Sequence, residues 1–318
     1  MTDLSVLLGP ISALVLAPLI PGIINRTKAV VAGRTGQSLL QLYADLLRLF
    51  RKGAVYSRTT SWVFKAGPVA GLSCMAVSLA MLPLGGVPGA MAFTGDLIVM
   101  VYLMGLSRFF TAAAAMDTGS AFEGMGASRE VQFSVLAEPA LLVGLAAVAL
   151  AAGPAGLFDA GPVVNGFRSL SEIYHQLTLS VWANDGAILL LAAAALFIVA
   201  LTENCRIPVD DPNTHLELTM IHEVMVLDHS GPDFGMILYA AALKLWFFLA
   251  LLSGLLIPVR SENLWINGIS TIIGIFFLAV GVGLVESVMA RLRLLRIPQL
   301  LAGALSLSAL ALVLVLWG

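Results

Sequence analysis

A polar loop between two long apolar segments gathers the residue types that could do chemistry in this chain. Residues 203–217 bring acids, an arginine and a histidine together, namely Glu203, Arg206, Asp210, Asp211, His215 and Glu217. Only 11% of the chain is charged, and charge beside a bilayer is costly to place, so a dense polar loop of this kind usually marks a working site. Carboxylates held there can exchange protons or pair with cations.

Further ionisable residues fall within or at the ends of apolar segments. They are Asp96, Arg108, Glu138, Glu203, Lys244 and Glu286. A charge at the centre of a bilayer costs at least ~2.5 kcal/mol, so these groups need internal partners or water. Two interpretations stay open, salt bridges between helices or a proton relay through carboxylates, and the number of groups favours the relay. Glu138 is its best candidate, because Pro139 loosens the helix hydrogen bonding beside it.

The sequence does not predict a metal site. His215, His222 and His229 recur every seven residues, which on a helix separates neighbours by about 10.5 Å, too far for two of them to bind one ion. His222 is instead a minor candidate for proton exchange. Cys74 and Cys205 are isolated, so neither an iron–sulfur cluster nor a thiolate zinc site is expected. With no nucleophile–base arrangement and no dinucleotide fingerprint, we expect no catalytic residue and no cofactor in this chain.

Membrane helices must position these groups. The chain has 318 residues, 59% of them hydrophobic, and a mean hydropathy of +0.96, which is typical of an all-α integral membrane protein. No run of alternating strand-like segments suggests a barrel. Eight stretches reach the roughly 20 apolar residues needed to cross a bilayer. We expect one transmembrane domain over residues 1–318, with spans at about 4–24, 67–84, 93–116, 133–152, 182–202, 234–257, 266–286 and 298–317.

Basic residues are unevenly divided between the loops. They gather in alternate loops, 25–66, 117–132, 203–233 and 287–297. The first of these carries eight Lys and Arg residues against a single acid, Asp45, whereas the loops on the other side hold only Arg168 and Arg260. The positive-inside rule therefore predicts that the four basic loops are cytoplasmic and that both termini face outward. We expect the protein to lie in the cytoplasmic (inner) membrane.

Residues 37–52 of the first basic loop predict an amphipathic helix. One face carries the polar residues Gln41, Asp45, Arg48 and Lys52, and the other carries leucines and aromatic residues. Such a helix would lie flat at the membrane interface. It would act as a surface anchor, as a docking site for a partner protein, or as both.

The second basic loop is rich in small residues. Gly124 and Gly126 permit close approach of the backbone, so residues 117–130 predict a tight, re-entrant or closely packed turn between two spans. The loop does not have the pattern of a phosphate-binding loop, because it lacks a Lys-Ser/Thr ending and a preceding strand.

Four stretches, spread from the first loop to the seventh span, carry a family resemblance. They are Arg34-x-Gly36-x-x-x-x-Gln41-x-x-x-Asp45-x-x-Arg48, then Asp117-Thr-Gly-Ser-x-Phe-x-x-Met-Gly126-Ala-Ser128-Arg129-Glu130 with Glu138-Pro139, then Glu203-x-x-Arg206-x-Pro208-x-Asp210 with Glu217-Leu218, and Glu286-Ser-x-x-Ala-Arg291-Leu-Arg293. Together they resemble the eight-span membrane-anchor subunit shared by respiratory complex I, where it is the quinone-site subunit, and the energy-converting group 4 nickel–iron hydrogenases. The run 214–223 looks like the hydrogenase branch, of the formate hydrogenlyase and hydrogenase-4 type.

This resemblance implies a non-catalytic subunit that docks a nickel–iron hydrogenase module and couples its electron transfer to proton or sodium translocation. The implied partners are the hydrogenase large and small subunits, an iron–sulfur electron-transfer subunit and antiporter-like membrane subunits, with the nickel–iron centre and the clusters held by partners. Besides the bilayer, no nucleic acid is expected as a partner. The residues expected to serve ion translocation are Glu138, Glu203, Asp210, Glu217 and Glu223, together with the buried charges Asp96, Lys244 and Glu286. Those expected at the docking surface are Arg34, Gln41, Asp45, Arg48, Arg129 and Arg206.

Two other functions stay open. One is the quinone-site subunit of a complex I-like NADH or ferredoxin dehydrogenase. Against it, that subunit usually has two further acids in the third basic loop, where this chain has Asn213 and His215. The other is a stand-alone secondary transporter, although such proteins often show repeated halves with matched helix breaks, and no matching halves are seen here.

Overall fold

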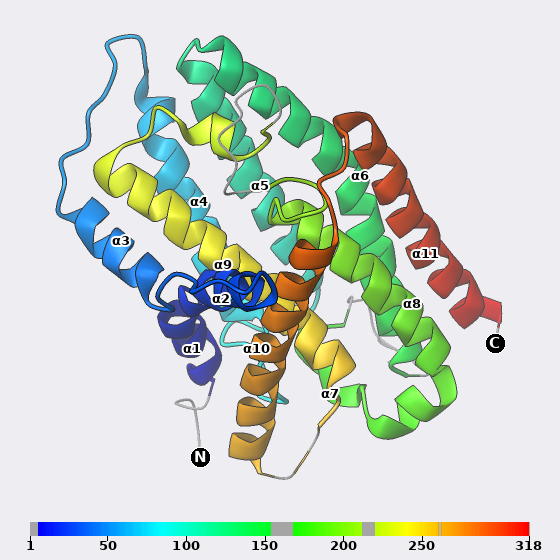
Figure 1. Ribbon diagram of the computed structural model, residues 1–318. Coiled ribbons are helices and arrows are strands. Elements are labelled where there is room, and N and C mark those ends of the chain that lie inside the picture. The colour runs from blue at the N-terminus through cyan, green and yellow to red at the C-terminus, as the bar shows by residue number, and fades with distance from the viewer. Residues whose placement is uncertain (1–5, 154–167, 212–219, 260, 262, 318) are drawn as a thin grey trace.

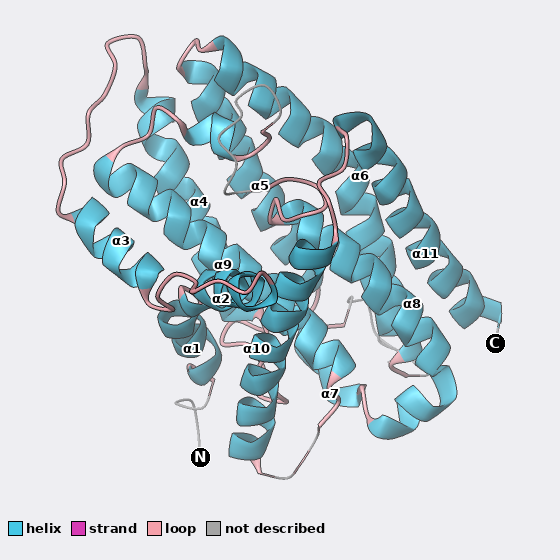
Figure 2. Cartoon of the chain, viewed as in Figure 1, coloured by secondary structure: helices cyan, strands magenta, loops and turns pink. Residues whose placement is uncertain are grey.

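The fold is built from helices. The computed structural model describes residues 6–153, 168–211, 220–259, 261 and 263–317. Within these residues there is no β-strand, and Leu84 and Val87 form an isolated bridge (Figure 2). In chain order the α-helices are α1 (Leu8–Leu16), α2 (Leu19–Val31), α3 (Gln41–Phe50), α4 (Trp62–Met81), α5 (Asp96–Asp117), α6 (Ala121–Ala151), α7 (Leu170–Gln176), α8 (Leu179–Glu203), α9 (Gly231–Leu256), α10 (Leu264–Val288) and α11 (Ile297–Trp317). Two 3₁₀ helices, η1 (Glu223–Val226) and η2 (Leu294–Arg296), precede α9 and α11.

Most of the long helices are suited to a membrane. Among the described residues, seven segments are long and apolar enough to cross one, and they contain α4, α5, α6, α8, α9, α10 and α11. Helices α1 and α2 pass the same test only as a pair, bent by 48° at the break between them. The chain is therefore an all-α, multi-pass membrane protein, which confirms the predicted fold class.

The first predicted span is broken rather than straight. Instead of one segment over residues 4–24, the chain forms α1 and α2 on either side of Ala17 and Pro18. Proline has no backbone N–H and its ring crowds the preceding turn, so a bend at this position is the expected result. Helix α2 then continues past the predicted end, as far as Val31.

The second basic loop is mostly helix. Helix α6 begins at Ala121 rather than near residue 133, so the predicted turn over 117–130 is reduced to a connection of three residues after Asp117. The small residues instead form the first turns of α6. Close packing is nevertheless present, because a side chain at Gly126 would meet Val224 Cγ1 at 2.3 Å.

Helix α9 lies at the centre of the bundle (Figure 1). Its residues Trp246, Phe247 and Phe248 are almost completely buried, and it contacts α3, α4, α8 and α10. Around it α4 packs on α5, α10 on α2, and α6 on both α8 and α11. A polar side chain on α9 is therefore brought close to polar side chains from several other helices.

The predicted amphipathic helix is α3, which is shorter at both ends than the predicted range of 37–52. It packs on α9 with Leu46 buried, while Leu47 and Phe50 stay exposed. On the polar side, Gln41 Nε2 donates a hydrogen bond to Asp45 Oδ1 at 3.0 Å. Helix α3 is thus attached to the bundle and still presents apolar side chains outward.

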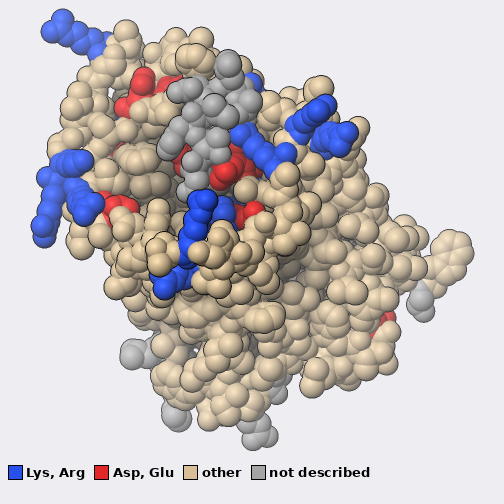
Figure 3. Space-filling model, in the orientation of Figure 1, with Lys and Arg blue, Asp and Glu red and all other residues tan. Residues whose placement is uncertain are grey.

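Charged side chains are concentrated at one end of the molecule. On the face shown in Figure 3, Lys, Arg, Asp and Glu gather in the upper part, and the lower part is nearly free of them. Large apolar side chains such as Tyr102, Phe277 and Trp317 are widely exposed on the helices. This distribution is expected where lipid and partner proteins cover the surface.

Candidate functional site

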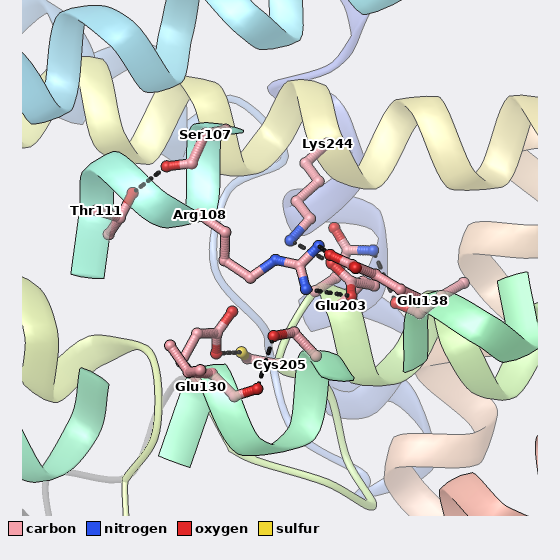
Figure 4. A network of polar contacts seen from close by, with 12 residues as sticks. Ser107, Arg108, Thr111, Glu130, Glu138, Glu203, Cys205 and Lys244 are labelled. Carbon is pink, nitrogen blue, oxygen red and sulfur yellow. Dashed lines mark hydrogen bonds and ion pairs between the residues drawn. The ribbon is translucent and has the colours of Figure 1, made fainter. Parts of the chain in front are cut away.

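The central polar feature is an ion-pair network that joins four helices (Figure 4). Arg108 on α5 places Nη2 3.0 Å from Glu138 Oε1 on α6, and Nη1 3.4 Å from Glu203 Oε1 at the end of α8. The other oxygen of Glu203 lies 2.8 Å from Lys244 Nζ on α9. Arg108 and Glu203 are buried, so each charge is compensated by neighbours rather than by water.

Two more carboxylates extend this polar region toward α10. Glu286 lies 2.9 Å from Lys28 Nζ and 3.5 Å from Arg206 Nη1. Asp210 Oδ1 lies 2.7 Å from Arg291 Nη2. These ion pairs join α2 to α10, and hold the segment after α8 against α10 and the residues that follow it.

A cavity of about 350 Å³ opens beside the network. Its lining includes members of the predicted translocation set, namely Glu203, Asp210, Glu223 and Lys244. It also includes members of the predicted docking set, namely Gln41, Asp45 and Arg206. Glu138 and Glu286 reach the cavity indirectly, because their partners Arg108 and Arg206 line it. The structure thus brings most of the translocation set and half of the docking set to one place.

Asp96 does not belong to this group. It is completely buried in the first turn of α5, where its carboxylate accepts hydrogen bonds from Ser169 Oγ at 2.6 Å and from the Leu170 backbone N at 2.8 Å. Arg108 lies twelve residues further along the same helix, about 18 Å away at 1.5 Å per residue. In the structure Asp96 therefore fixes the start of α7.

The remaining docking residues differ in exposure. Arg34 is exposed in the connection between α2 and α3, and Arg48 is mostly exposed, with Nη1 3.6 Å from Asp45 Oδ1. Arg129 instead points inward and donates from Nη1 to the Met220 carbonyl at 2.9 Å. Glu217 lies outside the described residues.

The structure also brings together residues that the sequence did not suggest as neighbours. Glu130 on α6, Cys205 after α8 and His222 before η1 line the same cavity, and their side-chain ligand atoms lie within 4.8 Å of one another. The Cys205 sulfur is 3.9 Å from Glu130 Oε2, and Figure 4 shows these two side chains pointing toward each other. Spacing along the chain could not reveal this cluster, because its members come from three separate segments.

Burial shifts the pKa values of Cys205 and His222, the two members of this cluster that lie outside the helices. It raises the pKa of the Cys205 thiol well above its usual value, and the nearby Glu130 and Asp210 carboxylates raise it further. It lowers the pKa of His222, which keeps the imidazole neutral near pH 7. A neutral imidazole can donate or accept a proton, or bind a cation.

The family of the chain follows from comparison with known proteins. Residues 4–317 match the model of the NADH dehydrogenase family. The chain belongs to this family. It is 33% identical to formate hydrogenlyase subunit 4 of Escherichia coli (strain K12) over 98% of both chains. It is 30% identical to hydrogenase-4 component C of the same strain, over 94% of this chain and 91% of that one.

The fold of this chain is similar to that of a solved structure. A chain of the membrane-bound sulfane sulfur reductase, an archaeal respiratory membrane complex, superimposes with a TM-score of 0.74 over 98% of both chains, at 21% identity. The two sequence relatives confirm the resemblance read from the four motifs, including its lean toward the hydrogenase branch.

Proposed function

We propose that this chain is the membrane subunit of a multisubunit energy-converting hydrogenase. It docks the nickel–iron module at the membrane and couples electron transfer to the translocation of protons or sodium ions. Support comes from two relatives whose names place them in formate hydrogenlyase and hydrogenase-4. The structural observation that carries the proposal is the ion-pair network of Glu138, Arg108, Glu203 and Lys244, which borders a cavity flanked by α3.

The shared cations give the network a way to respond to charge. Arg108 is shared between Glu138 and Glu203, and Glu203 is shared between Arg108 and Lys244. A change of charge in a partner beside the cavity would shift these cations from one carboxylate toward another. A buried carboxylate that loses its cation takes up a proton, and one that gains a cation releases it. Successive shifts of this kind would start ion movement along the membrane subunits.

Docking would take place at the charged end of the molecule. The exposed Arg34 and Arg48 and the cavity-lining Gln41 and Asp45 offer polar contacts there. Arg129 and Arg206 instead hold parts of the chain between α8 and η1, through the Met220 carbonyl and Glu286 respectively. The partners would be the hydrogenase large and small subunits and an iron–sulfur electron-transfer subunit, which would hold the nickel–iron centre and the clusters. Antiporter-like subunits would lie beside the helices. This end would face the cytoplasm, and both termini the outer side of the inner membrane.

A quinone-site subunit of a complex I-like dehydrogenase is the second candidate. The observation that favours it is the cavity, whose volume of about 350 Å³ falls within the range of roughly 300–1,000 Å³ usual for small-molecule sites. The names of the two sequence relatives favour the hydrogenase. Both are subunits or components of larger enzymes, which also speaks against the stand-alone transporter.

Composition of the native complex tests the proposal. The chain would be purified with its partners in mild detergent, and nickel, iron and hydrogen evolution would be measured together. We expect nickel and iron in the complex and hydrogen evolution from it. Iron without nickel, accompanied by bound quinone, would favour the second candidate, and a chain purified without partners or metals would overturn both.

A further inference from the structure

Glu130, Cys205 and His222 form a cluster that the ion-pair network does not use. The cluster lies where α6, the turn after α8 and the residue preceding η1 meet. Each residue contributes one ligand atom, a carboxylate oxygen, a thiol sulfur or a ring nitrogen, and these atoms lie within 4.8 Å of one another. We propose that this Glu–Cys–His cluster is a binding site for a thiophilic divalent cation such as Zn²⁺.

The first argument is that Glu130 forms no ion pair within 4 Å among the described residues. The neighbouring carboxylates Glu138, Glu203, Asp210 and Glu286 each have a Lys or Arg nitrogen within 4 Å. Among the described residues no Lys or Arg nitrogen lies that close to Glu130, although its exposed fraction is only 8%. A buried carboxylate needs a compensating charge or a proton, and a bound cation would supply it.

The second argument is the chemistry of the ligand set. A thiolate, an imidazole and a carboxylate together suit Zn²⁺, and hard cations such as Mg²⁺ and Ca²⁺ avoid sulfur. In a tetrahedral zinc site the sulfur and a carboxylate oxygen are about 3.5 Å apart, given bonds of about 2.3 and 2.0 Å. Cys205 Sγ and Glu130 Oε2 are 3.9 Å apart, so a small side-chain movement would close the site.

The third argument is the balance of charge and protons. Without a cation, the Cys205 thiol donates a hydrogen bond to Glu130 Oε2. Binding of a divalent cation would displace the thiol proton into the cavity. The thiolate and the carboxylate then neutralise the two positive charges, because His222 binds as neutral imidazole.

The site would keep one coordination position open. All three residues line the cavity of about 350 Å³, so a fourth ligand from the cavity, such as water, can complete a tetrahedron. Three protein ligands with an open position are typical of zinc sites that exchange a ligand. The ion would also tie α6 to the segments on either side of 212–219, and so fix one wall of the cavity.

Zinc binding to the full-length chain tests the proposal. The protein, carrying a purification tag without histidine, would be treated with a chelator in mild detergent and titrated with Zn²⁺. We expect one ion per chain, with zinc absorption spectra showing one sulfur ligand at about 2.3 Å and nitrogen or oxygen ligands at about 2.0–2.2 Å. Cys205→Ser should weaken binding by at least about tenfold, since even the loss of a residue that only hydrogen-bonds to a metal ligand usually costs that much affinity. Cys74→Ser, at the other buried cysteine, is the matched control and should bind as the unaltered chain does.

Two results would overturn the proposal. One is equal zinc affinity in Cys205→Ser and the unaltered chain, and the other is a spectrum without sulfur, since either would mean an adventitious ion only. If Cys205→Ser fails to fold, a second experiment is used instead, in which maleimide labels Cys205 in the Cys74→Ser chain. Saturating Zn²⁺ should then slow the labelling at least tenfold, and an unchanged rate would also overturn the proposal.

Discussion

Glu203 is the residue on which the buried network depends, because two cations from different helices share its carboxylate. Arg108 approaches one oxygen and Lys244 the other. Arg108 keeps a second partner in Glu138, whereas Lys244 has no other described carboxylate oxygen within 4 Å. Loss of the Glu203 charge would therefore leave the Lys244 ammonium without an ion pair in a largely buried position.

We predict that Glu203→Gln destabilises the chain by about 3–5 kcal/mol, the usual cost of removing one partner from a buried ion pair. The double variant Glu203→Gln with Lys244→Met should recover part of this loss, because it also removes the unpaired ammonium. Denaturant unfolding in detergent micelles would measure both. Additive effects of the two substitutions would show that the pair is not coupled.

Glu138 has a different role in the network, because its side chain is 40% exposed and Arg108 does not rely on it alone. We predict that Glu138→Gln leaves assembly and hydrogen evolution intact and lowers ion transport by about 100-fold or more, the typical contribution of a positioned proton-transfer group. Transport would be followed in liposomes containing the whole complex. Glu172→Gln, an exposed position on α7, is the control. Disappearance of the complex from membranes would contradict a specific role in coupling.

Sequence reasoning could identify these residues but could not pair them. A charge in an apolar segment is visible from local composition, so Glu138, Glu203 and Lys244 could be recognised from the sequence. The partner of each lies on another helix, and only the packing of the bundle determines it. For the same reason the nearness of Glu130 and Cys205 could not be predicted. Asp96 shows the same limit, because its position within an apolar segment was visible in the sequence and its contact with Ser169 was not.

Among the elements, the first turns of α6 show how polarity can conceal a helix. The small residues Gly124 and Gly126 indicated a turn here, and the polar residues around them kept the stretch out of the predicted span, because a membrane span is recognised by its apolar length. The structure places these residues on a helix that packs against η1. Gly126 makes this contact possible, whereas Gly124 on the same turn faces open space.

The two glycines give a matched pair of substitutions. At Gly126 an added Cβ would lie 2.3 Å from Val224 Cγ1 and 3.0 Å from the Ile221 carbonyl oxygen, so Gly126→Ala should cost about 1–3 kcal/mol through overpacking. At Gly124 nothing lies within 4 Å of the new Cβ, so Gly124→Ala should stabilise by up to about 1 kcal/mol through helix propensity. Thermal unfolding in detergent would compare them. Equal shifts would show that η1 does not depend on this close contact.

At the scale of the whole molecule, the described chain combines a largely apolar body with one charged end (Figure 3). The spans could be predicted because apolar length is a local property of sequence. The complete break between α1 and α2 could not be predicted, because Pro18 is compatible with either a kinked or a broken helix. The orientation of the charged end relative to the membrane stays a prediction of the loop charges.

Reporter fusions would test this orientation. The basic loop at residues 25–66 carries eight Lys and Arg residues, and such loops resist transfer across the inner membrane. We therefore predict that alkaline phosphatase fused after Trp317 is active and that green fluorescent protein at the same site is dark, since the C-terminus lies outside. An insertion after Arg58 should give the opposite pair of results. Bright fluorescence at the C-terminus would reverse the topology and place the cavity, and any partner docked beside it, on the outer side of the membrane.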